Sequence, residues 1–166
     1  MSSAGPFRCR VRSLRRLAIS IVLCFVPAVL GSLFTVSSIG SWYTTLAKPW
    51  FTPPDWLFGP VWTVLYLLMG ISLYRIWMHP GAPDIRLPVA VFGVQLALNA
   101  LWSFLFFGLQ SPRYGLLGII PLWIAILATI GIFYPVDRKA AYLLVPYILW
   151  VTIASALNYA VYVLNP

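Results

Sequence analysis

The sequence predicts an all-α membrane protein, a bundle of five transmembrane helices with a structured first loop rich in tryptophan and proline. Hydrophobic residues make up 61% of the 166 residues and charged residues only 8%, a composition that does not suit a water-soluble surface. Intervals free of Asp, Glu, Lys and Arg recur, each long enough for the roughly 20 residues that cross a bilayer as a helix. They are 17–47, 56–74, 87–112, 114–136 and 140–166. Backbone N–H and C=O groups need hydrogen-bond partners within the protein when they cross lipid, so we expect these spans to be helical. The period-2 alternation of a membrane β-barrel is missing.

We expect the helices at 15–38, 57–79, 87–108, 114–134 and 140–163. The first follows a basic opening segment, which we expect to be retained because its apolar core is long for a signal peptide and no clear cleavage site follows. The second begins around Gly59-Pro60, since a proline in the first helical turn lacks only an N–H that has no partner there. The other three each begin close behind a charged residue, respectively Arg86, Arg113 and Lys139.

The basic residues divide between the two ends of the predicted helices. Nine of the 11 precede the first helix or flank the second and fourth loops: Arg8, Arg10, Arg12, Arg15, Arg16, Arg75, Arg86, Arg138 and Lys139. Only Lys48 and Arg113 fall on the other side. The positive-inside rule therefore predicts a cytoplasmic N-terminal tail, 1–16, before a membrane domain, 17–166, in an inner or plasma membrane. Because the charge sorts by side and not into one patch, we expect no nucleic-acid partner.

The first loop is unusually stiff for a connection between two helices. It reads WYTTLAKPWFTPPDWLFGPVW over residues 42–62. Consecutive prolines exclude helix and hold an extended path, and the tryptophans present large rigid surfaces. We expect a preorganised lid over a cavity that opens on the outer side. Its candidate residues are Trp42, Lys48, Trp50, Phe51, Pro53 and Pro54.

Three of the predicted helices carry aromatic and amide residues on one face, at spacings of three and four. The faces comprise Trp62, Tyr66, Met69 and Leu73, then Gln95, Asn99, Trp102 and Phe106, and finally Tyr147, Trp150, Ala154, Asn158 and Val161. Their N–H and amide groups would be unsatisfied against lipid, so these faces are predicted to turn inward. Inside the bundle they either pack and bond to one another or line a ligand cavity, and spacing alone leaves both interpretations open.

Groups that perform chemistry are scarce. The three acidic residues are all Asp in predicted loops, which argues against a carboxylate-coupled carrier. The single histidine, His79, and the two cysteines, Cys9 and Cys24, have no metal-ligand spacing, so we expect no metal site and no required cofactor. No catalytic triad, carboxylate pair or phosphate-binding glycine loop is found, which excludes the hydrolase and kinase classes.

Four segments together carry a family resemblance: PAVLGSLFT, the first loop continued to WTVLYLLMG, QLALNALWSFLFF, and LLVPYILWVTIASALNYAVYVLN. They look like the tryptophan-rich sensory protein/translocator protein family (TspO/MBR), which includes the peripheral-type benzodiazepine receptor. The likeness runs from about residue 20 to the end and covers all five helices in order. Its most specific part is W-Y-x-x-L-x-K-P, then P-P, then F-G-P-V-W.

The resemblance implies a five-helix bundle, commonly a homodimer, that binds tetrapyrroles such as protoporphyrin IX or haem. Carried over by position, the ligand cavity would be lined by Trp62, Tyr66, Asn99, Trp102, Trp150, Ala154 and Leu157. Trp62 and Trp150 would also be the indoles associated with porphyrin photochemistry. For the dimer, Gly93 and Ala97 form a small-xxx-small step that permits close helix approach.

Two departures from the family pattern bear on function. Many members have tryptophan where this chain has Phe51, with Trp50 one position earlier, so a loop contact that requires an indole at this position is missing. The sterol-linked pattern after the fifth helix of animal members is absent, because no Lys or Arg follows Lys139. We therefore do not predict sterol transport.

Three functions remain open. The protein either binds a tetrapyrrole in sensing, transport or stress signalling, or degrades porphyrin in light with Trp62 and Trp150 as oxidisable groups, or is a membrane scaffold with a filled interior. Binding needs no catalytic side chain and is the interpretation we prefer. The propionates of a porphyrin would require a cation near the membrane surface, and Lys48 is the candidate on the first loop.

Overall fold

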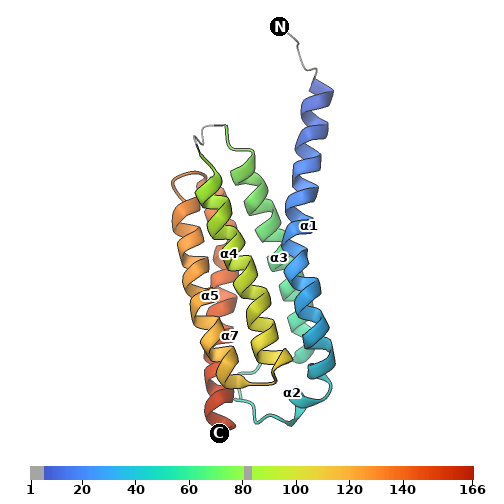
Figure 1. Cartoon of the computed structure of the whole chain (residues 1–166), viewed down its shortest axis with the longest axis vertical. Coiled ribbons are helices and arrows are strands. Elements are labelled where there is room, and N and C mark those ends of the chain that lie inside the picture. The colour runs from blue at the N-terminus through green and yellow to red at the C-terminus, as the bar shows by residue number, and fades with distance from the viewer. Residues whose placement is uncertain (1–5, 81–83) are drawn as a thin grey trace.

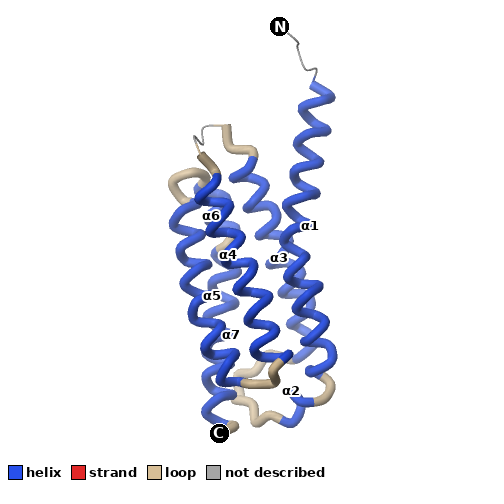
Figure 2. Tube along the Cα trace, in the orientation of Figure 1, coloured by secondary structure: helices blue, strands red, loops and turns tan. Residues whose placement is uncertain are grey.

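The computed structural model describes residues 6–80 and 84–166, with side chains from Ser13 onward (Figure 1). Its helices are α1 (Pro6–Ile39), α2 (Trp42–Thr45), α3 (Asp55–Trp77), α4 (Arg86–Ser103), η1 (Phe104–Gly108), α5 (Pro112–Phe133), α6 (Arg138–Leu143) and α7 (Val145–Leu164). The described part of the chain contains no strand (Figure 2). Five stretches are long and apolar enough to cross a membrane: α1, α3, α4 with η1, α5, and α6 with α7. The predicted fold class is confirmed.

The first helix begins earlier than the predicted 15–38. No proline or glycine interrupts residues 7–26, and Arg, Leu and Ala favour helix, so the basic opening segment continues α1 beyond the end of the bundle (Figure 1). Pro27 lies inside α1 without ending it. Which side of a membrane this end occupies stays a prediction.

The fifth predicted helix, at 140–163, is two helices that meet at Leu144. Pro146 has no N–H to donate to the carbonyl four residues earlier, and its ring crowds that turn. The helical ladder resumes where the N–H of Ile148 donates to the carbonyl of Leu144 (3.1 Å). The fifth predicted span is present, and Pro146 interrupts its helix, whereas Pro121 stays within α5.

The helices form a ring in which α1 packs against α3 and α4, α4 against α5, α5 against α7, and α6 against α3. The faces predicted to turn inward are the faces that this ring buries. Nine of their residues are exposed by 5% or less: Tyr66, Met69, Leu73, Gln95, Asn99, Phe106, Tyr147, Asn158 and Val161. Spacing at three and four residues therefore identified the interior correctly.

The end of α4 widens into the π-helical turn η1, which the sequence did not predict. The N–H of Leu109 donates to the carbonyl of Phe104, five residues earlier (2.9 Å). A π turn accommodates an extra residue, so two consecutive side chains, Phe106 and Phe107, are both buried. The hydroxyl of Ser38 joins this turn to α1 by donating to the carbonyl of Phe107 (2.8 Å).

An ion pair joins α3 to α6 at the end of the bundle that carries the N-terminus. Nη2 of Arg75 lies 2.8 Å from Oδ2 of Asp137, and the Asp137 side chain also accepts the N–H groups of Lys139 (2.9 Å) and Ala140 (3.2 Å). Burial acts to raise the pKa of Asp137, but the Ala140 N–H, the Arg75 guanidinium and the Lys139 N–H together outweigh it and lower that pKa below the ordinary 3.8. Asp137 is therefore a charged helix cap that stabilises two helices at once.

α1 and α3 approach each other closely at Gly70. A Cβ added at Gly70 would lie 2.9 Å from the Cα and 3.3 Å from the backbone nitrogen of Ile21, so no side-chain rotation relieves the contact. Gly131 of α5 faces open space, with no neighbouring atom within 4 Å of an added Cβ. Gly70 and Gly131 are therefore a tightly packed and an unpacked helical glycine whose substitution by alanine can be compared.

We expect Gly70→Ala to destabilise the bundle by about 1–2 kcal/mol, because overpacking against backbone exceeds the gain in helix propensity. Gly131→Ala receives the same propensity gain without the contact and should keep or raise the melting temperature. Thermal unfolding in detergent, followed by circular dichroism, measures both. A Gly70→Ala variant as stable as Gly131→Ala would contradict the close approach of α1 and α3.

Asp137→Asn should lower the melting temperature at neutral pH by a few degrees, because asparagine keeps the helix cap and loses the ion pair. A carboxylate with a lowered pKa stabilises the fold above its ordinary value and loses that contribution as the pH falls through the native-state value. Melting curves of both proteins between about pH 7 and 3 should therefore show a constant gap above about pH 5. The gap should close below pH 3.8, and a gap that ignores pH would show that the charge is not its source.

Candidate functional site

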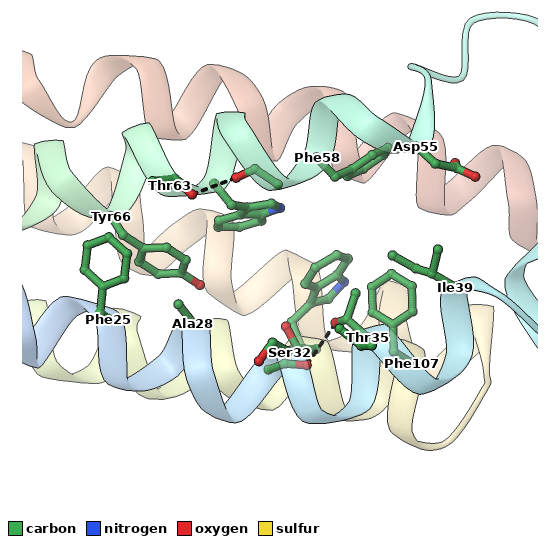
Figure 3. Close-up of a pocket in the computed structure, with 16 residues that line it drawn as sticks. Phe25, Ala28, Ser32, Thr35, Ile39, Asp55, Phe58, Thr63, Tyr66 and Phe107 are labelled. Atoms are coloured by element: carbon green, nitrogen blue, oxygen red, sulfur yellow. Dashed lines mark hydrogen bonds between the residues drawn. The ribbon is translucent and has the colours of Figure 1, made fainter.

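A cavity of about 340 Å³ lies between α1, α3 and the end of α4 with η1 (Figure 3). Its wall includes Phe25, Ala28 and Thr35 of α1, Phe58, Trp62 and Tyr66 of α3, and Trp102 and Phe107 at the end of the third span. Figure 3 shows Phe25 and Tyr66 at one end of the cavity, and Asp55 and Ile39 at the other. Three stretches far apart in the sequence therefore build one site.

Two threonine hydroxyl groups in the wall donate to carbonyls of their own helices. Thr35 donates to the carbonyl of Gly31 and Thr63 to the carbonyl of Gly59, each at 2.9 Å (dashed in Figure 3). A ligand would therefore meet mainly methyl groups and aromatic rings, the usual surface of a small-molecule cavity.

One edge of the cavity is open along α1 and α3. Four of its lining residues there are exposed at the surface of the bundle: Ser32, Val36, Gly59 and Thr63. Both helices span the membrane, so the opening between them faces the bilayer for much of its length. A lipid-soluble molecule can therefore enter sideways, without crossing the bundle.

Trp62 lies at the centre of a group of aromatic rings in the cavity wall. Its ring lies 5.5 Å from that of Tyr66 at an interplanar angle of 29°, and 6.4 Å from that of Trp102 at 27°. Tyr147 contacts the same indole edge-on at 6.1 Å and 67°. Tyr66, Trp62 and Trp102, which we call the aromatic wall, therefore form a stacked series along the cavity.

A buried amide holds the aromatic wall from behind. Oδ1 of Asn99 accepts the Tyr66 hydroxyl at 2.5 Å, and Nδ2 of Asn99 donates to the Tyr147 hydroxyl at 3.0 Å. A second amide, Asn158, accepts Nε1 of Trp102 at 3.4 Å and donates to the carbonyl of Pro112 at 2.8 Å. Each amide thus joins three helices or helix ends and limits the rotation of the rings it binds.

The predicted lining residues are divided among three places. Trp62, Tyr66 and Trp102 line the cavity, and Asn99 lies behind them. Ala154 and Leu157 line a separate space of about 30 Å³ beside α7. Trp150 lies in an apolar groove between α3 and α7, with its Nε1 buried and without a hydrogen-bond partner among the described residues. Gly93 and Ala97 are exposed on α4, and their role in a dimer stays a prediction.

Phe58 is the residue that connects these three places, and the sequence interpretation missed it. Its ring lines both the cavity and the smaller space, as do Trp102 and Phe107. It also packs edge-on against Trp150, at 5.7 Å and 72°. Its position four residues before Trp62, on the same face of α3, was the available signal.

The first loop is tied to the end of α7. The N–H of Ala47 donates to Oδ1 of Asn165 (2.9 Å), and Nδ2 of Asn165 donates to the carbonyl of Ala47 (3.0 Å). Trp42 packs edge-on against Phe106 at 5.6 Å. Among the other predicted lid residues, Trp50 is 95% exposed and packs edge-on against Phe51, while Pro53 and Pro54 lead directly into α3. The loop is therefore anchored at Trp42 and Ala47, and Trp50 faces outward.

Charged groups gather where the loop meets the cavity. Nζ of Lys48 lies 4.0 Å from Oδ1 of Asp55 and 3.8 Å from the ring centroid of Tyr43. Burial, and then the carboxylate of Asp55, raise the pKa of Tyr43 to about 12, so its phenol is neutral at physiological pH. Among the described residues, no three His, Cys, Asp or Glu side chains come together as metal ligands do.

Comparison with known proteins agrees with this architecture. The model of the TspO/MBR family matches residues 20–164. The chain is 50% identical to Tryptophan-rich protein TspO of Archaeoglobus fulgidus, over 90% of this chain and 97% of that protein. It is 45% identical to Tryptophan-rich protein TspO of Chlorobaculum tepidum (90% and 96% covered) and 40% identical to Protein CrtK of Rhodobacter capsulatus (93% and 95% covered). With five spans and this match over nearly its whole length, the chain belongs to the TspO/MBR family of membrane proteins.

Proposed function

We propose that the protein binds a tetrapyrrole, such as protoporphyrin IX or haem, in the cavity between α1 and α3, in a sensing or transport role. The observation that carries this proposal is the aromatic wall, in which the rings of Tyr66 and Trp102 are each inclined by less than 30° to the ring of Trp62. A planar macrocycle gains dispersion and stacking energy on such a surface. Rings already held in place by hydrogen bonds lose little rotamer freedom when the ligand binds.

The entrance suits the same ligand. Protoporphyrin and haem partition into membranes, and the open edge between α1 and α3 faces the bilayer. Exchange with lipid requires no aqueous path, and no side chain needs to perform chemistry. The shape and surface of the site, together with the family resemblance, support a tetrapyrrole.

The size of the ligand assigns a role to Phe58. A cavity of about 340 Å³ is near the lower limit for drug-sized ligands, and a tetrapyrrole is larger than most of them. Rotation of Phe58 away from the aromatic wall would join the cavity to the small space lined by Ala154 and Leu157. Ala154 and Leu157, which the family resemblance implies, would then line one enlarged site with Trp62, Tyr66 and Trp102.

Light-dependent porphyrin degradation is the second candidate function. Trp62 lies in the wall where a bound macrocycle would stack, which places an oxidisable indole beside the pigment. Trp150 is separated from the cavity by Phe58, so oxidation would start at Trp62. This function requires the same binding step, and illumination distinguishes the two.

The binding step is tested by titrating the detergent-purified protein with protoporphyrin IX in the dark and following the porphyrin absorbance. Trp62→Phe should weaken binding by at most roughly 12-fold, because phenylalanine keeps a smaller stacking ring and the full loss of an aromatic pair is the upper bound. Trp150→Phe, outside the cavity, is the matched control and should change the affinity less. Absence of saturable binding at micromolar porphyrin would refute the proposal. Light-dependent bleaching that Trp62→Phe abolishes would instead favour degradation.

Phe58→Ala should accelerate protoporphyrin association severalfold, because the ring that separates the two spaces is removed. Quenching of tryptophan fluorescence in a stopped-flow experiment measures this rate. Phe104→Ala is a suitable control, since Phe104 packs against Phe34 outside the cavity. If both variants associate at the wild-type rate, Phe58 does not limit entry.

A further inference from the structure

The mouth of the cavity presents a negative charge to an incoming ligand. Asp55 is the one Asp, Glu, Lys or Arg among the residues that line the described cavity, and it stands in the first turn of α3. The positive end of the helix dipole stabilises a carboxylate in that place. Its side chain is 47% exposed, which leaves it accessible to ligand and solvent.

The nearest cation is already engaged by two groups of the protein. Lys48 pairs with Asp55 at 4.0 Å and lies over the ring of Tyr43 at 3.8 Å, a distance typical of a cation–π contact. The preceding residue, Ala47, is held by two hydrogen bonds to the side chain of Asn165. With 23% of its side chain exposed, Lys48 is more enclosed than Asp55, and it does not line the cavity.

We infer that Asp55 is a specificity-determining residue, because it competes with the carboxylates of an anionic ligand for the ammonium group of Lys48. The inference rests on the proposed function and deepens it. A porphyrin whose propionates lie at the mouth can pair with Lys48 only by displacing Asp55. A neutral macrocycle of the same shape leaves the pair intact. Asp55 therefore weakens the binding of dianionic porphyrin relative to its neutral ester.

The competition differs from simple repulsion in one respect. Repulsion between Asp55 and a propionate acts whether or not Lys48 is present, whereas competition requires Lys48. Removing the carboxylate in proteins with and without the lysine therefore separates the two effects, in the manner of a double-mutant cycle.

The test compares protoporphyrin IX with its dimethyl ester in wild type, Asp55→Asn, Lys48→Met and the double variant, by dark titration in one detergent at low salt. Asp55→Asn should tighten binding of the free acid about two- to fivefold, the range of a partly exposed ion pair, and leave the ester unchanged. Lys48→Met should weaken binding of the free acid and leave binding of the ester unchanged. In the Lys48→Met background, Asp55→Asn should change the affinity for neither ligand.

Several results would overturn the inference. If Asp55→Asn changes the affinities for the free acid and the ester equally, the residue acts on the cavity as a whole. If the gain for the acid persists fully in the Lys48→Met background, Asp55 acts by repulsion and not by competition. Saturable binding of the ester to wild type keeps the proposed function separate from either failure, whereas absence of binding by both porphyrins refutes the two together.

Discussion

The structure depends on the rule that a polar group inside a bilayer needs a partner from the protein. Asn99 meets this requirement for two tyrosines at once, and Asn158 does so for Trp102 and for a carbonyl at the start of α5. Because each amide binds several helices, the rings it holds are oriented by the assembly of the whole bundle and not by local packing. The cavity surface is therefore organised before any ligand arrives, and the amides that organise it do not occupy it.

The cavity has two parts with different surfaces. The part within the bilayer is apolar and aromatic, open on the side of α1 and α3, and suited to a flat lipid-soluble body. The part beside the first loop carries Asp55, with Lys48 and Tyr43 next to it. Under the proposed function, the part in the membrane would recognise the shape of the ligand and the part at the membrane surface its charge. Such a division allows the charge preference to change by substitution in the loop without disturbing the aromatic wall.

Much of this arrangement could be predicted from the sequence. Five spans followed from charge-free intervals, and the inward faces of α3, α4 and α7 followed from aromatic and amide residues spaced by three and four. The contribution of α1 could not, because Phe25, Ala28 and Thr35 have no polar pattern that distinguishes them from lipid-facing neighbours. Phe107 enters the wall through a π turn, and the break at Leu144 depends on how Pro146 is accommodated. Both features depend on tertiary packing and cannot be predicted from the spacing of apolar residues.

The pair of hydrogen bonds between Ala47 and Asn165 makes the first loop and the last turn of α7 one mechanical unit. A flap hinged freely at its two ends is therefore the wrong picture of this loop. Moving the middle of the loop would break the two hydrogen bonds between Ala47 and the Asn165 side chain, or would move the end of α7 with it. The last turn of α7 is thus bonded directly to the loop at the rim of the cavity, although 118 positions of sequence separate Ala47 from Asn165.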